Sequence, residues 1–157
     1  MALEKVVLPV YSKTEEILNS VSHGIGVLLG IAFLIIGIQK STLGNNLAAS
    51  IVFGISSIVL YTCSMLYHSL KAGTAKKAMR LYIIVGVAAG VMAYPIFKYN
   101  DFSWLSVFLV VGGGIVYLIG MAIYKIGKKK KYYHSVFHLF VIAGSCMHFA
   151  AIYINLI

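Results

Sequence analysis

Five apolar runs, separated by short polar or basic segments, make up most of this chain. They lie at about residues 16–38, 47–70, 81–97, 105–124 and 133–157. A helix needs about 20 apolar residues to cross the ~30 Å hydrocarbon core of a bilayer, and about 17 is the lower limit. We therefore predict an all-α, polytopic transmembrane helix bundle of five spans over residues 15–157, preceded by a tail at residues 1–14. Thr14 is the predicted N-cap of the first helix.

Polar side chains inside the first two runs recur at helical spacing. The first set follows the pattern i, i+3, i+4, i+7 and consists of Glu16, Asn19, Ser20 and His23. The second set follows i, i+4, i+7, i+11 and consists of Ser57, Tyr61, Ser64 and His68. Residues at these spacings share one face of a helix, so each set forms a single stripe. In the fourth run, Gly112-Gly113-Gly114 and Gly120 predict close contact with another helix.

The composition excludes an ordinary soluble domain. Of the 157 residues, 61% are hydrophobic and 11% are charged, and the mean hydropathy is +0.93. The formal net charge of +9 does not indicate nucleic acid, because the lysines lie between the apolar runs. Cys63 and Cys146 belong to no C-x-x-C pair, so we predict buried, inert thiols rather than a redox or zinc motif. The runs are too long and too many for a secretory signal peptide, so we interpret the N-terminus as retained.

The basic residues predict the orientation of the bundle. An odd number of spans puts the two termini on opposite sides of the membrane. The basic loops at residues 71–80 and 125–131 lie on the side of the N-terminal tail, whereas Lys40 and Lys98 lie on the other side. Because cytoplasmic loops carry the excess of Lys and Arg, we expect a cytoplasmic N-terminus and an outside C-terminus. The expected location is the plasma membrane of a bacterium, as a multi-pass protein.

The start of the fifth run carries the strongest candidate for chemistry. His134 and His138 lie four residues apart on one helix face, and His68 ends the second run at the same expected depth near the cytoplasmic side. Three protein ligands and an open fourth position are the pattern of catalytic zinc, which lowers the pKa of a bound water to ~7. We therefore expect these three histidines to bind Zn²⁺. Ser64, one turn before His68, is the candidate catalytic residue that orients the water or a polar substrate group.

Structural roles stay open for several of these residues. His23 enters the membrane from the same side, but a lone histidine near a span end is commonly an interfacial residue. Ser64 can instead bond to the backbone carbonyl four residues earlier. His148 follows His134 by fourteen residues, ~21 Å along a helix, so it cannot share that metal. We expect it to make a hydrogen bond in the core.

Three motifs occur in order along the chain. They are Glu16-x-x-Asn19-x-x-Ser22-His23-Gly24, then Ser64-x-x-x-His68, then His134-x-x-x-His138 followed by Leu-Phe-Val-Ile-Ala-Gly-Ser. From about residue 15 to the end, the chain resembles the hemolysin III proteins, which belong with the progestin and adiponectin receptors. The resemblance implies a seven-span fold with a zinc ion near the cytoplasmic side, held by His68, His134 and His138. Because the wider superfamily includes ceramidases, it also implies a zinc-dependent hydrolase of lipid amides. The hemolysin name refers to a cytolytic, pore-like activity.

The chain departs from this family after Arg80. There the family has a third span that opens with Leu-Asp-x-Ser, and its Asp helps to position the water on the zinc. Here Arg80 is followed by Leu81-Tyr82-Ile83-Ile84, which looks like the family's fifth span. The resemblance therefore implies that two spans and the Asp are missing. Glu16, beside Asn19 and His23, is the one acid that could replace it.

Three functions are compatible with these observations. The first is a zinc-dependent hydrolase of a ceramide-like lipid amide. The second is a cytolytic or pore-forming membrane protein, and the third is a non-catalytic, metal-binding, receptor-like protein, which the missing Asp favours. The expected partners are the lipid bilayer and a lipid substrate, without nucleic acid. Association of two chains as a homo-oligomer to replace the missing helices stays open.

Overall fold

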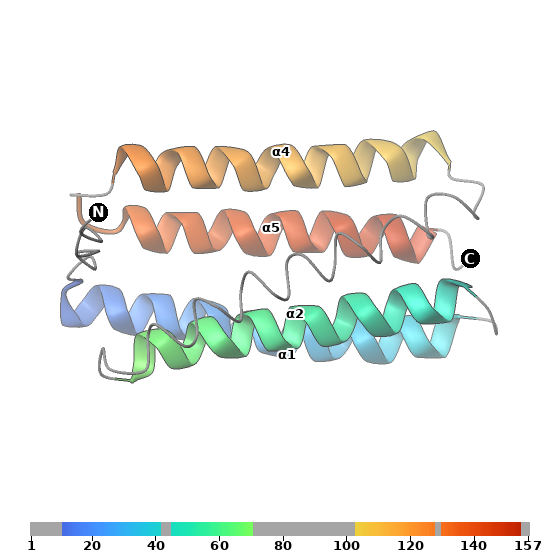
Figure 1. Ribbon diagram of the computed structural model, residues 1–157, viewed down its shortest axis with the longest axis horizontal. Coiled ribbons are helices and arrows are strands. Elements are labelled where there is room, and N and C mark those ends of the chain that lie inside the picture. The colour runs from blue at the N-terminus through green and yellow to red at the C-terminus, as the bar shows by residue number, and fades with distance from the viewer. Residues whose placement is uncertain (1–10, 42–44, 71–102, 128–129, 155–157) are drawn as a thin grey trace, which may run out of the picture.

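The computed structural model describes residues 11–41, 45–70, 103–127 and 130–154, and these contain helices and no strand. The four helices are α1 (Lys13–Lys40), α2 (Asn45–Ser69), α4 (Trp104–Ile126) and α5 (Tyr133–Ile154). They lie side by side along their whole lengths, with α1 beside α2 and α4 beside α5 (Figure 1). The start of α1, the end of α2, the end of α4 and the start of α5 share one end of the bundle.

These helices confirm four of the predicted spans within about three residues at each described end. All four are long and apolar enough to cross a membrane. The predicted span at 81–97 lies outside the described residues. Thr14 was the wrong N-cap, because Ser12 and Glu15 form a capping box that starts α1 at Lys13. Each of these two residues accepts a hydrogen bond from the backbone of the other, so two donors at the helix start are satisfied.

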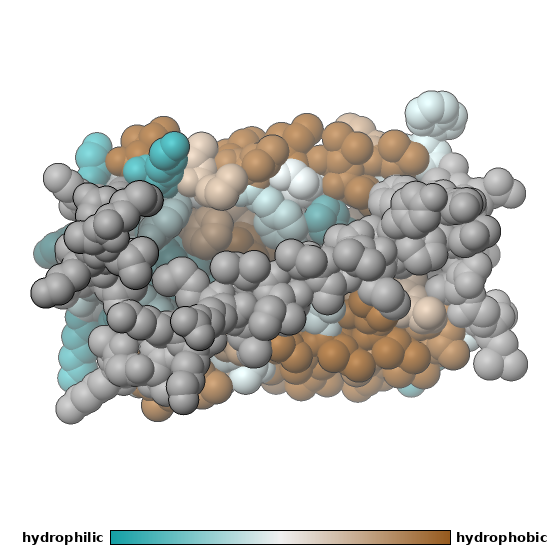
Figure 2. Space-filling view, in the orientation of Figure 1, coloured by the Kyte–Doolittle hydropathy of each residue, from teal (hydrophilic) through white to brown (hydrophobic). Residues whose placement is uncertain are grey.

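The bundle is polar inside and apolar outside, the reverse of a soluble protein. Its described surface exposes many large apolar side chains on every helix, and apolar residues cover both helix pairs in Figure 2. The buried polar residues are Glu15, Asn19, His23, Ser50, Ser57, Ser64, His68, Ser106, His138 and Ser145. Lipid gives no hydrophobic reason to bury apolar side chains, whereas polar groups must be satisfied inside the bundle. The chain is therefore a multi-pass membrane protein, and in a bacterium the plasma membrane is its expected location.

Glycines let α1 and α2 approach each other closely. Gly26 and Gly30 of α1 form a G-x-x-x-G pair facing α2, and a Cβ on Gly30 would lie 3.0 Å from the backbone nitrogen of Ile58. On α2, a Cβ on Gly54 would lie 2.8 Å from Cα of Leu34. Such contacts involve backbone atoms, which cannot rotate away. Small residues in this pattern are a common basis of helix association in membranes.

We expect Gly54→Ala to lower the free energy of unfolding by about 1–3 kcal/mol, because the added methyl group forces the two backbones apart. Thermal unfolding in detergent, followed by circular dichroism, measures the change. Gly114→Ala is the matched control, because a Cβ there meets nothing within 4 Å and alanine favours a helix more than glycine. Equal stability of the two variants would contradict this packing.

Helix α5 is the element that touches all three others. Its Ser145 hydroxyl accepts a hydrogen bond from Tyr61 of α2 at 2.7 Å and lies 2.8 Å from the Tyr117 hydroxyl of α4. Gly113 of α4, as predicted, lies against α5, at His148 and Gly144. Through these contacts α5 fixes the two helix pairs on each other.

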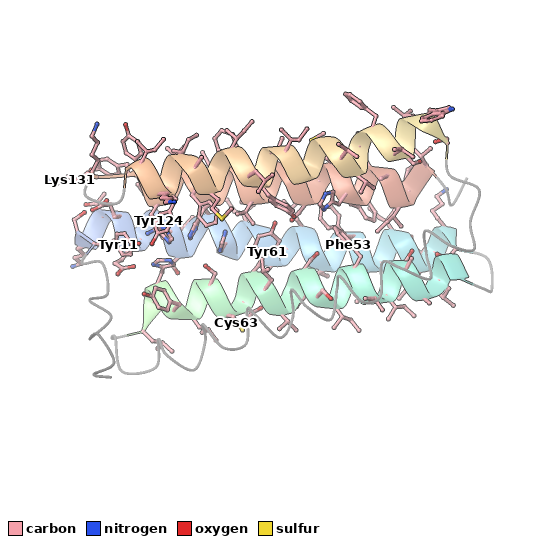
Figure 3. All side chains as sticks on the ribbon, turned by 45° about the horizontal axis from the view of Figure 1, so that its top comes forward. Tyr11, Phe53, Tyr61, Cys63, Tyr124 and Lys131 are labelled. Carbon is pink, nitrogen blue, oxygen red and sulfur yellow. The ribbon has the colours of Figure 1, made fainter. Side chains whose placement is uncertain are left out.

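The two cysteines differ from the prediction of buried thiols. Cys63 is half-buried and Cys146 is exposed, and both are free. Figure 3 shows Cys63 on the outer side of α2. An apolar thiol tolerates a lipid-facing position as well as a protein core, so the cysteines carry no argument about function.

Candidate metal centre

The three predicted histidines meet at one end of the bundle. The Nε2 atom of His134 lies 3.0 Å from the Nε2 atom of His68 and 3.0 Å from that of His138. One ligand atom from each residue lies within 4.8 Å of the others. His68 comes from the last turn of α2, and the other two from the first turns of α5. The i, i+4 spacing thus brings two imidazoles together on one helix, and helix packing adds the third.

Hydrogen bonds on the outer ring nitrogens fix the orientation of two of these rings. Nδ1 of His68 lies 2.5 Å from a carboxylate oxygen of Glu16. Nδ1 of His138 lies 3.2 Å from the backbone carbonyl oxygen of Asn19 and 3.0 Å from the hydroxyl of Ser22. A carboxylate and a carbonyl oxygen accept only, so both Nδ1 atoms carry the proton. In the neutral rings, the lone pairs of both Nε2 atoms therefore point at the centre.

The three converging nitrogens can all bind one metal ion, but they cannot all be satisfied by hydrogen bonds to one another. A neutral His134 has at most one proton on Nε2, so it can donate to only one of its two neighbours and leaves the lone pair of the other without a donor. A cation between the three Nε2 atoms satisfies all of them. Tetrahedral zinc, with Zn–N bonds of about 2.0–2.1 Å, places its nitrogens about 3.3–3.4 Å apart, close to the 3.0 Å that separates His134 from each of the other two histidines. The three histidines could therefore hold a metal ion.

One side of α1 joins the start of α5 to the site. Asn19, Ser22 and His23 all contact His138, through the carbonyl, the hydroxyl and the ring. The Asn19 side chain also accepts a hydrogen bond from Ser135 at 2.6 Å. Glu16 and Ser20 lie on the adjacent side of α1 and contact α2 instead, at His68 and Ser69. The predicted single stripe Glu16, Asn19, Ser20, His23 is therefore divided between two neighbouring helices.

Glu15 ties the beginnings of α1 and α5 together. Its carboxylate accepts hydrogen bonds from the backbone of Ser12 at 2.9 Å and of Tyr132 at 2.7 Å. Tyr132 has φ 66°, a left-handed conformation that costs energy for a residue other than glycine. The hydrogen bond that the Tyr132 backbone donates to Glu15 compensates part of this cost and fixes the entry of the chain into α5, two residues before His134.

Tyr11 covers the site at the end of the bundle. Its ring stacks on His134 with a centroid distance of 4.9 Å and meets the edge of His68 at 5.8 Å. Burial, and after it the neighbouring Tyr124, raises the pKa of the Tyr11 hydroxyl above its ordinary value. The hydroxyl therefore stays protonated and can donate. Figure 3 shows Tyr11, Tyr124 and Lys131 at this same end, where hydrophilic residues gather in Figure 2.

Other candidates take different places. Ser64 is buried one turn before His68, and among the described residues no hydrogen bond joins its hydroxyl to the three histidines. His148 bonds through Nε2 to the carbonyl oxygen of Val110 at 3.1 Å, as expected. His23 is buried against the ring of His138 rather than interfacial. Glu16 faces the outer nitrogen of His68 rather than the point where the three Nε2 atoms converge.

Sequence reasoning missed the roles of Glu15, Ser22 and Ser135. The spacing Ser12-x-x-Glu15 is a capping-box signal and could have placed the first of them. Ser22 and Ser135 become visible only when the rotation of α1 against α5 is known, because many serines in these helices have equivalent local spacing.

Comparison with known proteins points in one direction. The family described as "Haemolysin-III related" matches residues 11–82. The chain is 28% identical to the "Hemolysin-3 homolog" of Bacillus subtilis (strain 168) over 195 residues, covering 86% of this chain and 91% of that protein. It is 27% identical to "Hemolysin-3" of Bacillus cereus, covering 86% of this chain and 89% of that protein. No solved structure matches this chain.

The length of the alignment also agrees with the expectation that two spans of the family are missing here. Since 86% of the 157 residues is about 135, about 60 positions of the 195-residue match to the Bacillus subtilis protein have no counterpart in this chain. Two helical spans with their loops need about this length. The family match ends at residue 82, two residues beyond Arg80, where the sequence motifs predict the break.

Proposed function

Because this chain belongs to the hemolysin III family, we propose that it is a zinc-binding membrane protein that hydrolyses a ceramide-like lipid amide. His68, His134 and His138 are the proposed zinc ligands. The observation that carries the proposal is their arrangement: three Nε2 atoms converge, while Glu16 and Asn19 hold the outer nitrogens of two rings. Metal-bound histidines in proteins have this second hydrogen bond almost without exception.

The distribution of basic residues supports a position of the three-histidine centre near the cytoplasmic surface of the membrane. By the positive-inside rule, the end that carries the N-terminus and the basic loops faces the cytoplasm. The three histidines lie at that end, within the first or last two turns of their helices. The proposed reaction therefore occurs near the inner surface of the membrane, where the headgroup and amide of a lipid lie.

Each neighbouring residue has a defined task in this proposal. When bound, zinc supplies a Lewis acid and activates water at neutral pH. Glu16 and Asn19 keep the ligand nitrogens unprotonated and aimed at the centre. Tyr11, whose ring stacks on His134, excludes bulk water, and its protonated hydroxyl is proposed to donate to a polar substrate group. Ser64 is proposed to orient the water or substrate. Water adds across the amide, the C–N bond breaks, and a fatty acid and an amine are released.

The test is hydrolysis of a short-chain ceramide in detergent micelles, with the released fatty acid measured by mass spectrometry. We expect turnover by the zinc-loaded protein, loss after chelation, and recovery when zinc is restored. His68→Ala should be inactive, whereas Cys146→Ala, at an exposed position outside the site, should retain activity. Zinc bound at full occupancy without turnover would contradict hydrolysis and select the non-catalytic, receptor-like function.

A second candidate is membrane permeabilisation, which the names of the two Bacillus relatives favour. It makes an independent prediction. If the protein is cytolytic, it releases a trapped dye from liposomes, and His68→Ala does so equally well, because the apolar outer surface is unchanged. Liposomes that stay tight would count against this candidate.

A further inference from the structure

His23 is a buried imidazole for which the described residues provide no hydrogen-bond partner. It is 4% exposed, and neither Nδ1 nor Nε2 has a partner. A neutral imidazole always carries one N–H donor and one acceptor. Leaving both unsatisfied is unfavourable, because each buried group has lost its hydrogen bonds to water. Such a side chain in a membrane interior therefore indicates a ligand that it binds.

The other unpartnered groups lie in the same place. Among the described residues, the buried polar side-chain atoms without a partner belong to Asn19, His23 and His134. All three residues contact His138. Asn19 does so through its backbone carbonyl oxygen, His23 does so through its ring, and His134 does so through Nε2. The Asn19 amide oxygen accepts from Ser135, so its unpartnered atom is the donor nitrogen. Unused hydrogen-bonding capacity is thus concentrated around His138.

The stacking geometry decides what His23 can do there. Its ring lies parallel to that of His138, with a centroid distance of 3.6 Å and an interplanar angle of 10°. Lone pairs on two parallel rings point along parallel planes, so both cannot bind one ion. His23 is therefore not a fourth protein ligand. Its ring lies 3.6 Å, centroid to centroid, from a ring whose Nε2 faces the metal position, so a small group bound beside His138 is its nearest candidate partner.

The hydroxyl and carboxyl groups near His23 are already hydrogen-bonded to other residues. Tyr61 meets the ring of His23 at 5.1 Å, edge to face, but its hydroxyl donates to Ser145. Ser22 contacts Nδ1 of His138, and Glu16 is engaged with His68. Of the described side chains that touch His138 without being a proposed metal ligand, His23 and Asn19 have a free N–H, and of these two only His23 has a ring stacked on that of His138.

We propose that the N–H of His23 donates a hydrogen bond to the non-protein ligand at the fourth position of the three-histidine centre. The ligand is a small oxygen or nitrogen group: water at rest, or the carbonyl oxygen of a bound amide. His23 is then a positioning residue, which holds that ligand without binding the metal. This inference rests on the proposed metal centre and names a ligand-binding residue within it.

The experiment uses the full chain in detergent, loaded with Co²⁺ in place of zinc, and azide as the probe of the fourth position. Visible absorption reports both cobalt binding and azide binding. We expect His23→Phe, which keeps the stacked ring, to bind cobalt within about threefold of wild type. Azide affinity should fall at least about tenfold, the loss of one hydrogen bond to a charged group. His23→Gln, which keeps a donor, should recover part of it.

Tyr61→Phe is the matched control, because it changes the other neighbour of His23 and should leave azide affinity unchanged. Equal azide affinity in His23→Phe and wild type, with cobalt bound in both, would overturn the inference and leave the metal centre intact. Loss of cobalt in His23→Phe would also overturn it, since His23 would then be needed for metal binding itself. Failure of the wild-type protein to bind cobalt would instead refute the metal centre, and the inference with it.

Discussion

Replacement of His138 by alanine is expected to lower zinc affinity by at least ~100-fold, the upper range for loss of a partner that only orients a ligand. Removing the ligand itself leaves two histidines from different helices and no fixed third nitrogen. His138 is 1% exposed, so water cannot easily take its place. Zinc affinity is measured by competition with a chromogenic chelator in detergent, and hydrolysis should disappear in parallel.

Two further variants separate loss of metal from loss of folding. His68→Ala removes a ligand from α2 and should give the same loss of zinc, although it leaves the contacts between α1 and α5 in place. His148→Ala removes a histidine that bonds to Val110, far from the centre, and should retain zinc. Zinc affinity that falls equally in all three variants would show that the effect is on the fold.

Glu16→Leu is expected to weaken zinc binding by about 10–100-fold, although Glu16 does not bind the metal. The carboxylate accepts the Nδ1 proton of His68 and so keeps Nε2 free for the metal. Without this acceptor the ring can rotate or take the other tautomer. The same chelator competition measures the loss.

Glu16→Gln provides the graded control, because an amide oxygen can still accept the proton but carries no charge. Its zinc affinity should lie between those of the wild-type protein and Glu16→Leu. Ser69→Ala, next to His68 and bonded to Ser20, should have little effect. Wild-type affinity in Glu16→Leu would mean that the carboxylate does not orient His68.

Local patterns in the sequence were sufficient to predict the four described helices and the three histidines that meet at one end of the bundle. The i, i+4 spacing of His134 and His138 places two rings together on any helix. His68 could be added because topology and helix rise give depth in a membrane, which a soluble protein does not offer. The stripe Ser57, Tyr61, Ser64, His68 is buried along its length, because polar groups in lipid turn inward.

Which helix each polar residue of α1 contacts depends on the rotation of the helices about their axes. Glu16 and Asn19 lie on one face of α1 by periodicity, yet one contacts α2 and the other α5. The face is wide enough to meet two neighbours, and its division follows from the packing of Gly26 and Gly30 against α2. Sequence spacing does not contain this angle, so the separate roles of Glu16 and His23 could not be predicted.

The zinc content of the wild-type protein, purified in detergent without added metal and measured by mass spectrometry, tests the central claim most directly. We expect about one zinc per chain, lost on chelation and regained from solution, as for other sites of three protein ligands. Protein that is folded and helical but contains no zinc, and takes up none when it is supplied, would contradict the account.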